Sequence, residues 1–478
     1  MTRVSRRLFL QETLLAAAAA APGSAWAAAE PTKQSASPNE RLNMAIIGAR
    51  IRGGQHVQVF GGRRDCAITH ICDADSTVGE QLAAKIPNKP KFVQDMRRIF
   101  DDKSIDVVTI CTPNHWHSLA AIWAMQAGKD VYVEKPVSHN IGEGRRMVQA
   151  ARKYNRICQA GTQHRANGVH RAAARYVREG KLGRVTLAYS CVSGTRGSIG
   201  PAGQYSPPPT VDYDLWSGPA PMEIPVRRKS FHYDWHWFWN WGGGELANNS
   251  VHYVDTLRLI TGLAGLGRGV LCLGARLGLD DCAETPNVQL AVHDFGPATL
   301  VQEIRNLKGR RPKHGSIYIA GTEGYLAGEL GRLCAYDRQG NELLELSGPA
   351  LDHFGSFLEA VRTRNREALS AEVEGGHVST SLIHVANISH RLGRPASPKE
   401  IQEALEARKT HPYAMEMLEE ICQYLRDRQI DLEKTPLALG PSIEIDSDRE
   451  NFIGNPAANT LLTRDYRRPF VVPAENEL

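Results

Sequence analysis

The sequence contains few long apolar runs. Beyond the first 29 residues, no segment approaches the roughly 20 apolar residues that a transmembrane helix needs. None of the nine cysteines forms a Cys-x-x-Cys pair, and no histidine–cysteine group has the spacing of a structural zinc site, so we expect no bound metal. The net charge is only +5, with 57 basic and 52 acidic residues and no long basic run, so nucleic acid is not an expected partner. The composition is that of a globular protein, long enough for two or more domains.

The first 29 residues have the pattern of an export signal. Residues 5–10, Ser-Arg-Arg-Leu-Phe-Leu, form a twin-arginine signature; residues 13–21 are mildly apolar, and residues 25–27 form an Ala-x-Ala cleavage site. An uncleaved membrane anchor is the alternative, but the apolar stretch is short for that role. We therefore expect the twin-arginine machinery to export a folded protein to the periplasm or beyond. The mature form would have no membrane anchor, and residues 30–41 would be a linker.

The remaining sequence predicts two different sheets, and therefore an α/β fold. Short apolar runs alternate with amphipathic stretches over residues 42–160, which indicates a doubly wound Rossmann domain that binds a dinucleotide. Residues 161–400 contain more extended segments and fewer helices, which predicts an α+β domain for substrate binding and oligomerisation, built on a large, open, mostly antiparallel sheet. Residues 401–478 are expected to form a helical extension and an irregular C-terminal tail.

A glycine-containing turn follows the first predicted strand. Gly48 and Gly53 keep the spacing of the first and last glycines in Gly-x-Gly-x-x-Gly, although Arg50 replaces the middle one. Asp73 ends the second predicted strand, 20 residues after Gly53. A carboxylate there can accept the ribose hydroxyls of NAD and repel the 2′-phosphate of NADP. A helix N-cap at Asp73 or Asp75 is the alternative, and both roles are compatible.

Two further motifs end neighbouring strands. Glu134-Lys135-Pro136 follows the apolar run at residues 130–133, and Thr112-Pro113-Asn114 follows the strand before it. In an open α/β sheet, ligands bind at the carboxyl edge of the strands, so Lys135 places an ammonium group where a reaction would occur. A solvated lysine at the end of a surface strand is the less specific interpretation.

Together these motifs resemble the Gfo/Idh/MocA oxidoreductase family, which includes glucose–fructose oxidoreductase and inositol dehydrogenase. The resemblance covers most of the chain after residue 42 and depends on the order and spacing of all the motifs. They are Gly48 with Arg52-Gly53, Cys72-Asp73-x-Asp75, Thr112-Pro113-Asn114-x-x-His117, Glu134-Lys135-Pro136, Gly161-Thr162-Gln163, Trp216-Ser217-Gly218-Pro219, Gly242-Gly243-Gly244, His252-x-x-Asp255 and the closing stretch 461–469.

The resemblance implies a set of functional residues. The catalytic residues would be Lys135, Asn248 and His252, with His252 taking the hydroxyl proton and Lys135 stabilising the alkoxide. The substrate would contact His164, Trp239, Asn248 and His252. The cofactor would contact Gly48, Arg52, Gly53, Asp73, Thr112, Pro113, Asn114, His117, Glu134, Lys135 and Gln163.

Asn248 departs from the family pattern, which has aspartate at this position. Asparagine carries no charge, so it cannot hold an imidazolium as a carboxylate would, and Asp255 is another candidate for orienting His252. Ser250 also stands where glycine is usual. These departures keep open a non-catalytic nucleotide- or sugar-binding protein with a degenerate site.

Residues 231–241 are unusually aromatic. Four of the eight tryptophans fall within the seven residues 235–241. Aromatic faces stack on sugar rings, which favours a carbohydrate pocket, whereas a hydrophobic plug or subunit contact is the alternative. No spacing supports a metal held by His115, His117 and His164.

The predicted function is an exported NAD-dependent oxidoreductase acting on a sugar or sugar derivative. NADP is less expected than NAD, and the cofactor would be tightly bound, since little free NAD is available outside the cytoplasm. One alternative is a glycoside-cleaving enzyme that transiently oxidises the sugar, eliminates the leaving group and then re-reduces the ring. The family resemblance further implies a homodimer or homotetramer.

Overall fold

The computed structural model describes residues 41–309, 311–408 and 411–478. The predicted signal peptide and all but the last residue of the predicted linker lie outside the described residues. Within the described ranges, no helix combines the length and the apolar character needed to cross a membrane.

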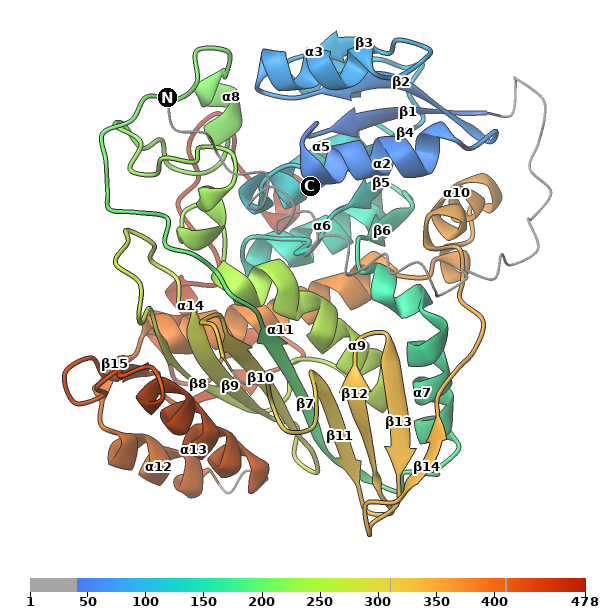
Figure 1. Ribbon diagram of the computed structural model, residues 1–478. Helices are drawn as coiled ribbons and strands as arrows, with labels where there is room; N and C mark the ends of the chain where they lie inside the picture. Colours follow the sequence, from blue (N-terminus) through green and yellow to red (C-terminus); the bar gives the residue numbers. More distant parts are fainter. Residues whose placement is uncertain (1–40, 310, 409–410) are drawn as a thin grey trace.

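The N-terminal domain is built on a six-stranded parallel sheet in the order β3-β2-β1-β4-β5-β6 (Figure 1). Its central strands β1, β4 and β5 are almost entirely buried, because helices cover both faces of a parallel sheet. The sheet confirms the predicted Rossmann architecture. The strands are β1 (Leu42–Ile47), β2 (Cys66–Cys72), β3 (Lys91–Val93), β4 (Val107–Ile110), β5 (Asp130–Val133) and β6 (Cys158–Ala160). The helices are α2 (Ile51–Gly61), α3 (Ser76–Ala84), α4 (Arg97–Asp101), α5 (His117–Gln126) and α6 (Ile141–Lys153).

The order of the strands locates the functional edge of this sheet. The chain reverses direction across the sheet between β1 and β4, and ligands bind at such a switch point beyond the carboxyl ends of the strands. Gly48 follows β1, Thr112 comes two residues after β4, and Glu134 follows β5. The topology therefore brings three of the predicted motifs to one crevice.

The second domain contains a large sheet in the order β14-β13-β12-β11-β7-β10-β9-β8-β16-β15. Only β7 and β10 pair in parallel in this series; the other pairings are antiparallel, which confirms the predicted mostly antiparallel sheet. The strands are β7 (Val185–Ser193), β8 (Gly269–Ala275), β9 (Val288–Asp294), β10 (Thr299–Arg305), β11 (Ile317–Gly321), β12 (Tyr325–Glu329), β13 (Arg332–Tyr336), β14 (Glu342–Glu345), β15 (Arg394–Ala396) and β16 (Leu437–Leu439).

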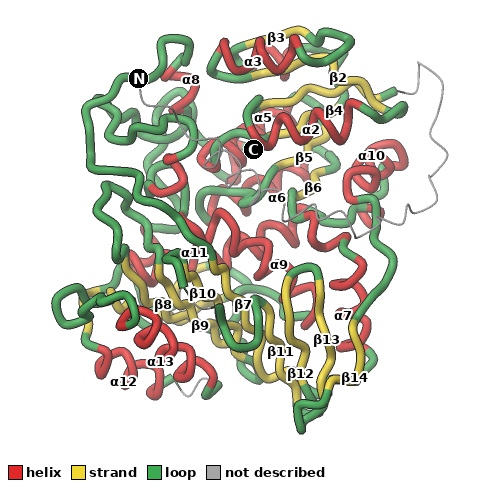
Figure 2. Tube along the Cα trace, viewed as in Figure 1, coloured by secondary structure: helices red, strands yellow, loops and turns green. Residues whose placement is uncertain are grey.

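Helices pack on both faces of this sheet (Figure 2). The face toward the Rossmann domain is covered by α7 (Gly168–Arg178), α9 (Val251–Thr261) and α11 (Val373–Arg391). The opposite face of β7 to β10 is covered by α12 (Pro398–Ala407) and α13 (Tyr413–Arg426), which bury Ile401, Met417 and Ile421 against the sheet. The remaining α-helices in the described residues are α10 (His353–Thr363) and the two short helices α8 (Tyr213–Ser217) and α14 (Pro456–Thr460).

The C-terminal tail is more regular than the sequence predicts. Strand β16 and strand β17 (Ile443–Asp446) both pair with β8, and β18 (Asn451–Phe452) pairs with β17. The prediction of an irregular tail was wrong here, because strands of two to four residues are too short to show periodicity. Strands β16 and β17 take their hydrogen bonds from β8, which is far away in the sequence.

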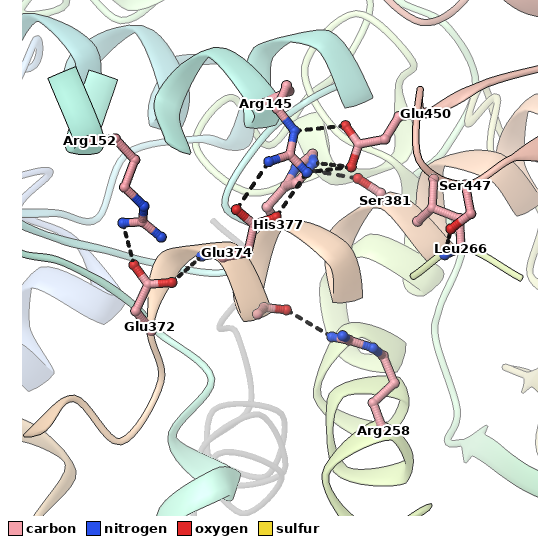
Figure 3. Close-up of polar contacts among 11 residues, drawn as sticks. Arg145, Arg152, Arg258, Leu266, Glu372, Glu374, His377, Ser381, Ser447 and Glu450 are labelled. Carbon is pink, nitrogen blue, oxygen red and sulfur yellow. Dashed lines mark hydrogen bonds and ion pairs between the residues drawn. The ribbon is translucent and has the colours of Figure 1, made fainter. Parts of the chain in front are cut away.

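A charged network fixes the two domains to each other (Figure 3). Arg145 on α6 donates to Glu374 on α11 at 2.8 Å and to Glu450 of the tail at 2.6 Å. His377 on α11 also contacts Glu450, with 2.8 Å between Nε2 and the carboxylate. Burial alone would raise the pKa of Glu450, but His377 and Arg145 lower it to about 2. The two domains are therefore held together by polar contacts between three segments of the chain.

Candidate active site

The turn after β1 leaves no room for side chains at two positions. Gly48 has a φ of +93°, and a Cβ there would lie 2.6 Å from the main chain of Cys111. A Cβ at Gly53 would lie 1.9 Å from the carbonyl oxygen of Gly48. Because only glycine fits, the backbone turns tightly into the N-terminus of α2. Such a turn presents N–H groups to a phosphate, so this part of the chain fits a dinucleotide.

Asp73 lies beside this turn at the end of β2. Its carboxylate accepts hydrogen bonds from the main-chain N–H of Ala49 at 2.7 Å and of Asp75 at 2.9 Å. Burial nevertheless raises the pKa of Asp73 to about 6. The N-cap of α3 is Asp75, which accepts from the N–H groups of Thr77 and Val78. Asp73 itself does not cap α3 and remains at the crevice, where a ribose would contact it.

Arg52 and Glu134, both predicted to contact the cofactor, are bonded to each other. Arg52 Nη2 lies 2.5 Å from Glu134 Oε1, and His56 Nε2 lies 2.9 Å from the same oxygen. Burial would raise the pKa of Glu134, but Arg52 and His56 hold it well below its ordinary value. This network fixes the first turns of α2 to the end of β5. His56 was missed by the sequence analysis, because no motif marks it.

Lys135 follows Glu134 and points toward the second domain. Its ammonium group donates to the main-chain oxygen of Asn248. Burial lowers the pKa of Lys135 to about 8. Asn248 lies in the π-helical segment η5 (Leu246–Ser250), which leads into α9. Single π-turns occur often at functional sites, and here the contact to Lys135 uses the backbone of residue 248.

His252 and His164 lie side by side. Their rings are 4.9 Å apart and nearly perpendicular. Burial, followed by the charge of Lys135, lowers the pKa of His252 well below its ordinary value, and burial lowers the pKa of His164 to about 4. The Nδ1 atom of His252 is buried without a hydrogen-bond partner among the described residues. His252 is therefore a neutral imidazole whose Nδ1 has no protein partner among the described residues.

Asp255 does not hydrogen-bond to His252 among the described residues. Its Oδ1 accepts from Arg165 at 3.0 Å and from Ser379 on α11 at 2.6 Å. The interpretation that Asp255 orients His252 directly is therefore wrong for this conformation. Asp255 instead fixes α9 to the helical turn η3 (Gln163–Ala166) and to α11.

The remaining predicted cofactor contacts cluster at the ends of β4 and β6. The ring nitrogens of His117 lie 2.6 Å from the carbonyl oxygen of Pro136 and 2.8 Å from that of Thr112, so His117 ties two strand ends together. The side-chain oxygens of Thr112 and Gln163 are buried without a partner among the described residues. Unpaired polar atoms at this edge fit a polar ligand between them. Pro113 precedes the helical turn η2, and Asn114 begins it.

The aromatic segment divides into a core and one outlying residue. Trp235, Trp237 and Trp241 belong to a buried cluster, as the hydrophobic-plug interpretation predicts. Trp239 is only partly buried and lies beside α11, with 5.4 Å between its ring and the guanidinium of Arg391. Trp239 is thus the one tryptophan of the segment with a surface to offer a ligand.

No group of three histidine, cysteine, aspartate or glutamate side chains is arranged to hold a metal ion in the part of the chain that the structure describes. His115 Nε2 lies 2.9 Å from the main-chain oxygen of Trp216, and both ring nitrogens of His117 contact carbonyl oxygens.

Known families match both domains. A model for an oxidoreductase family with an NAD-binding Rossmann fold matches residues 42–162, and one for the C-terminal alpha/beta domain of the same family matches residues 201–407. The chain belongs to the Gfo/Idh/MocA oxidoreductase family. The N-terminal domain is therefore an NAD-binding Rossmann domain of this family.

Curated relatives share only part of the chain. The inositol 2-dehydrogenase 1 of Saccharopolyspora erythraea is 30% identical over 23% of this chain and 36% of its own length. A glycosyl hydrolase family 109 protein of Shewanella putrefaciens is 30% identical over 24% of this chain and 27% of its own length. The chain thus matches about a third of the length of these relatives.

Solved structures share the fold over a larger part of the chain. Levoglucosan dehydrogenase, in complex with NADH and levoglucosan, is 19% identical with a TM-score of 0.54, covering 72% of this chain and 96% of that protein. The WlbA dehydrogenase of Bordetella pertussis, in complex with NADH and UDP-GlcNAcA, is 20% identical with a TM-score of 0.56, covering 73% of this chain and 97% of that protein. At this identity the likeness supports the fold alone.

Proposed function

We propose that the mature protein is an exported NAD-dependent oxidoreductase acting on a sugar or sugar derivative. The observation that carries the proposal is Lys135, whose pKa is lowered to about 8, standing beside neutral His252 at the carboxyl edge of an NAD-binding sheet. When bound, NAD supplies the hydride acceptor. The named activities of the inositol and levoglucosan dehydrogenases support a cyclic polyol as substrate.

The side chains divide the proton chemistry between them. Lys135, with its pKa lowered to about 8, exchanges the proton of the sugar hydroxyl that becomes a carbonyl, a role that the sequence analysis gave to His252. His252 stays neutral, because burial and Lys135 oppose its protonation, and it accepts a hydrogen bond through its free nitrogen. The main-chain oxygen of Asn248 holds the ammonium in place. The missing charge at position 248 therefore does not remove the positioning of Lys135.

A strap from the second domain supports tight retention of the cofactor. Asp75 forms a β-bridge with Val211, accepts a hydrogen bond from Thr210 at 2.8 Å, and lies 2.9 Å from His232. These bonds hold the strap against the residues that directly follow Asp73, where the adenosine half of NAD would lie. A bound nucleotide would leave only after the strap opens.

Small molecules released by denaturing the purified, signal-processed protein test this function. We expect NAD or NADH near one per chain, and reduction of bound NAD on adding D-glucose, myo-inositol or levoglucosan. NADP in place of NAD would overturn the role of Asp73. If the protein neither contains nor binds nucleotide, the non-catalytic binding protein becomes the better account.

A glycoside-cleaving enzyme is the second candidate. The likeness to a glycosyl hydrolase family 109 protein and the uncharged Asn248 favour it. In that reaction the sugar is oxidised, the aglycone is eliminated, water adds to the resulting double bond and the carbonyl is reduced again, so the cofactor ends in its starting state. Release of p-nitrophenol from a p-nitrophenyl glycoside, without net change in bound NAD, would distinguish it from a simple dehydrogenase.

The preference for NAD over NADP is expected to depend on pH. Asp73 has its pKa raised to about 6, so it is charged above that pH and neutral below it. The dissociation constant of NADP divided by that of NAD should fall about tenfold from pH 8 to pH 5, because the repulsion between Asp73 and the 2′-phosphate of NADP is lost. Fluorescence titration of the nucleotide-free protein measures the ratio. Asp73→Asn is the control that accounts for titration of the phosphate itself, and an equal pH dependence in both proteins would contradict the prediction.

Export by the twin-arginine machinery and assembly into a homodimer or homotetramer belong to the same proposal. The twin-arginine signature supports export. Helices α12 and α13 cover part of the outer sheet face, so the strands β12 to β14 beyond them, with partly exposed Leu344, are the surface that we propose for assembly.

A further inference from the structure

An ion pair that no sequence motif marks stands next to Lys135. Arg196 lies in the loop after β7, and Glu245 lies directly before η5. Two bonds join them, with 3.0 Å from Nη2 to Oε1 and 3.2 Å from Nε to Oε2. The side chain of Glu245 is 1% exposed, whereas that of Arg196 is 28% exposed. The carboxylate of the pair is therefore buried, whereas the guanidinium side chain is partly exposed.

The helix that follows Glu245 places this pair relative to the reacting centre. Asn248, three residues later, accepts the hydrogen bond of Lys135 through its main chain. His252 comes four residues after Asn248, so Glu245 and His252 flank the point of contact by about one turn on each side. The pKa of Lys135 responds to both members of the pair, raised by Glu245 and lowered by Arg196. Glu245 and His252 are therefore each about one turn from the residue that Lys135 contacts.

Other polar groups surround the pair. Asn249 donates its amide to Glu245, and Arg196 Nη1 donates to the hydroxyl of Tyr233 at 3.3 Å. The guanidinium also lies 5.5 Å from the ring of Trp237. His236 uses Nδ1 on the carbonyl oxygen of Tyr233, at 2.6 Å, and its Nε2 has no partner among the described residues. Tyr233, His236 and Asn249 are all only partly buried.

These groups have the chemistry that a sugar ring requires. A hydroxyl group both donates and accepts, so neighbouring hydroxyls pair well with a guanidinium beside an amide, whose directions a buried carboxylate fixes. The ring of Trp237 packs against the guanidinium of Arg196 and restricts its movement. A pair that served stability alone would not need a half-open guanidinium surrounded by partly exposed polar side chains.

We propose that Arg196 and Asn249, both held in position by the buried carboxylate of Glu245, bind the vicinal hydroxyls of the sugar ring, next to the carbon that reacts at Lys135. The inference rests on the proposed sugar oxidoreductase function and specifies its substrate class. The substrate is a cyclic polyol with an intact diol beside the reacting carbon, and analogues lacking one of those hydroxyls are poor ligands.

Calorimetric titration of the NAD-loaded protein tests the inference. The probes are D-glucose, 2-deoxy-D-glucose, 3-deoxy-D-glucose and myo-inositol. Wild-type protein should bind glucose or inositol, and should bind at least one deoxy sugar about tenfold more weakly than glucose. Glu245→Gln should weaken glucose and inositol about tenfold and remove most of the discrimination against that deoxy sugar. In turnover, KM should rise more than kcat falls.

Glu303→Gln is the matched control. Glu303 is also a fully buried carboxylate bonded to an arginine, Arg305, but it lies on the outer sheet face under α13. This variant should bind sugars as the wild type does. If Glu245→Gln fails to fold, Asn249→Ala provides the same test with a smaller structural change.

The outcomes distinguish failure of the hydroxyl-binding proposal from failure of the proposed oxidoreductase function. If folded Glu245→Gln and Asn249→Ala bind sugars as the wild type does, the proposed hydroxyl-binding role is overturned, and the oxidoreductase proposal is unaffected. Failure of the wild-type protein to bind any of the four probes overturns both.

Discussion

Replacing Lys135 with methionine is expected to lower kcat for sugar oxidation by about a thousandfold, the middle of the range for a positioned proton-transfer group. Methionine keeps much of the apolar stem but removes the group that exchanges the hydroxyl proton. The bond to the main-chain oxygen of Asn248 is lost as well. Turnover is measured by reduction of bound NAD, and NAD content by its release on denaturation.

Two comparisons make this result specific. Lys135→Arg keeps a positive charge, but arginine does not deprotonate near neutral pH, so it should be nearly as inactive. In the wild type, oxidation requires the neutral amine, which forms as the pH rises through about 8. The rate should therefore rise with pH up to that value and then level off. Wild-type turnover in Lys135→Met with full NAD content would remove Lys135 from the mechanism.

Replacing Glu134 with alanine is expected to cost about 3–5 kcal/mol of folding stability, because it leaves buried His56 and partly buried Arg52 without their shared carboxylate. The Glu134 side chain is 3% exposed and contacts both Arg52 and His56. Urea denaturation of the NAD-loaded and nucleotide-free proteins measures the change. The loss should appear in both, since the network fixes α2 to β5 whether or not nucleotide is present.

Glu345→Ala provides the comparison for this prediction. Glu345 pairs with Arg332, but both side chains are more than half exposed at the edge of the second sheet. Water screens such a pair, so the midpoint of denaturation should not change measurably. Equal effects of the two substitutions would contradict the structural role given to Glu134.

Local features of the sequence were enough to predict the Rossmann domain and the residues at its edge. Gly48 and Gly53 mark a tight turn because no other residue fits there, and Lys135 follows a continuous apolar strand. These signals are contained within a few residues. The alternation of strands and helices then determines the order of the sheet, which brings the motifs together.

The partners of these residues could not be predicted in the same way. Arg52 and Glu134 are 82 residues apart, and Arg196 and Glu245 are 49 apart, so neither pair leaves a local pattern. The same holds for His56, which is buried on the inner side of α2. A sequence motif identifies a residue that must be present, but the groups that set its charge and direction come from the tertiary fold.

The strap at Asp75 also imposes an order on the formation of the native protein. Thr210 and Asp75 are 135 residues apart, so their bond closes a very long loop, and we expect it to form late in folding. A ligand seated on Asp73 that arrives earlier is enclosed as the loop closes. One that arrives later must wait for the strap to detach. If NAD binds at Asp73 as we propose, its exchange should be limited by a local unfolding event rather than by diffusion into the crevice.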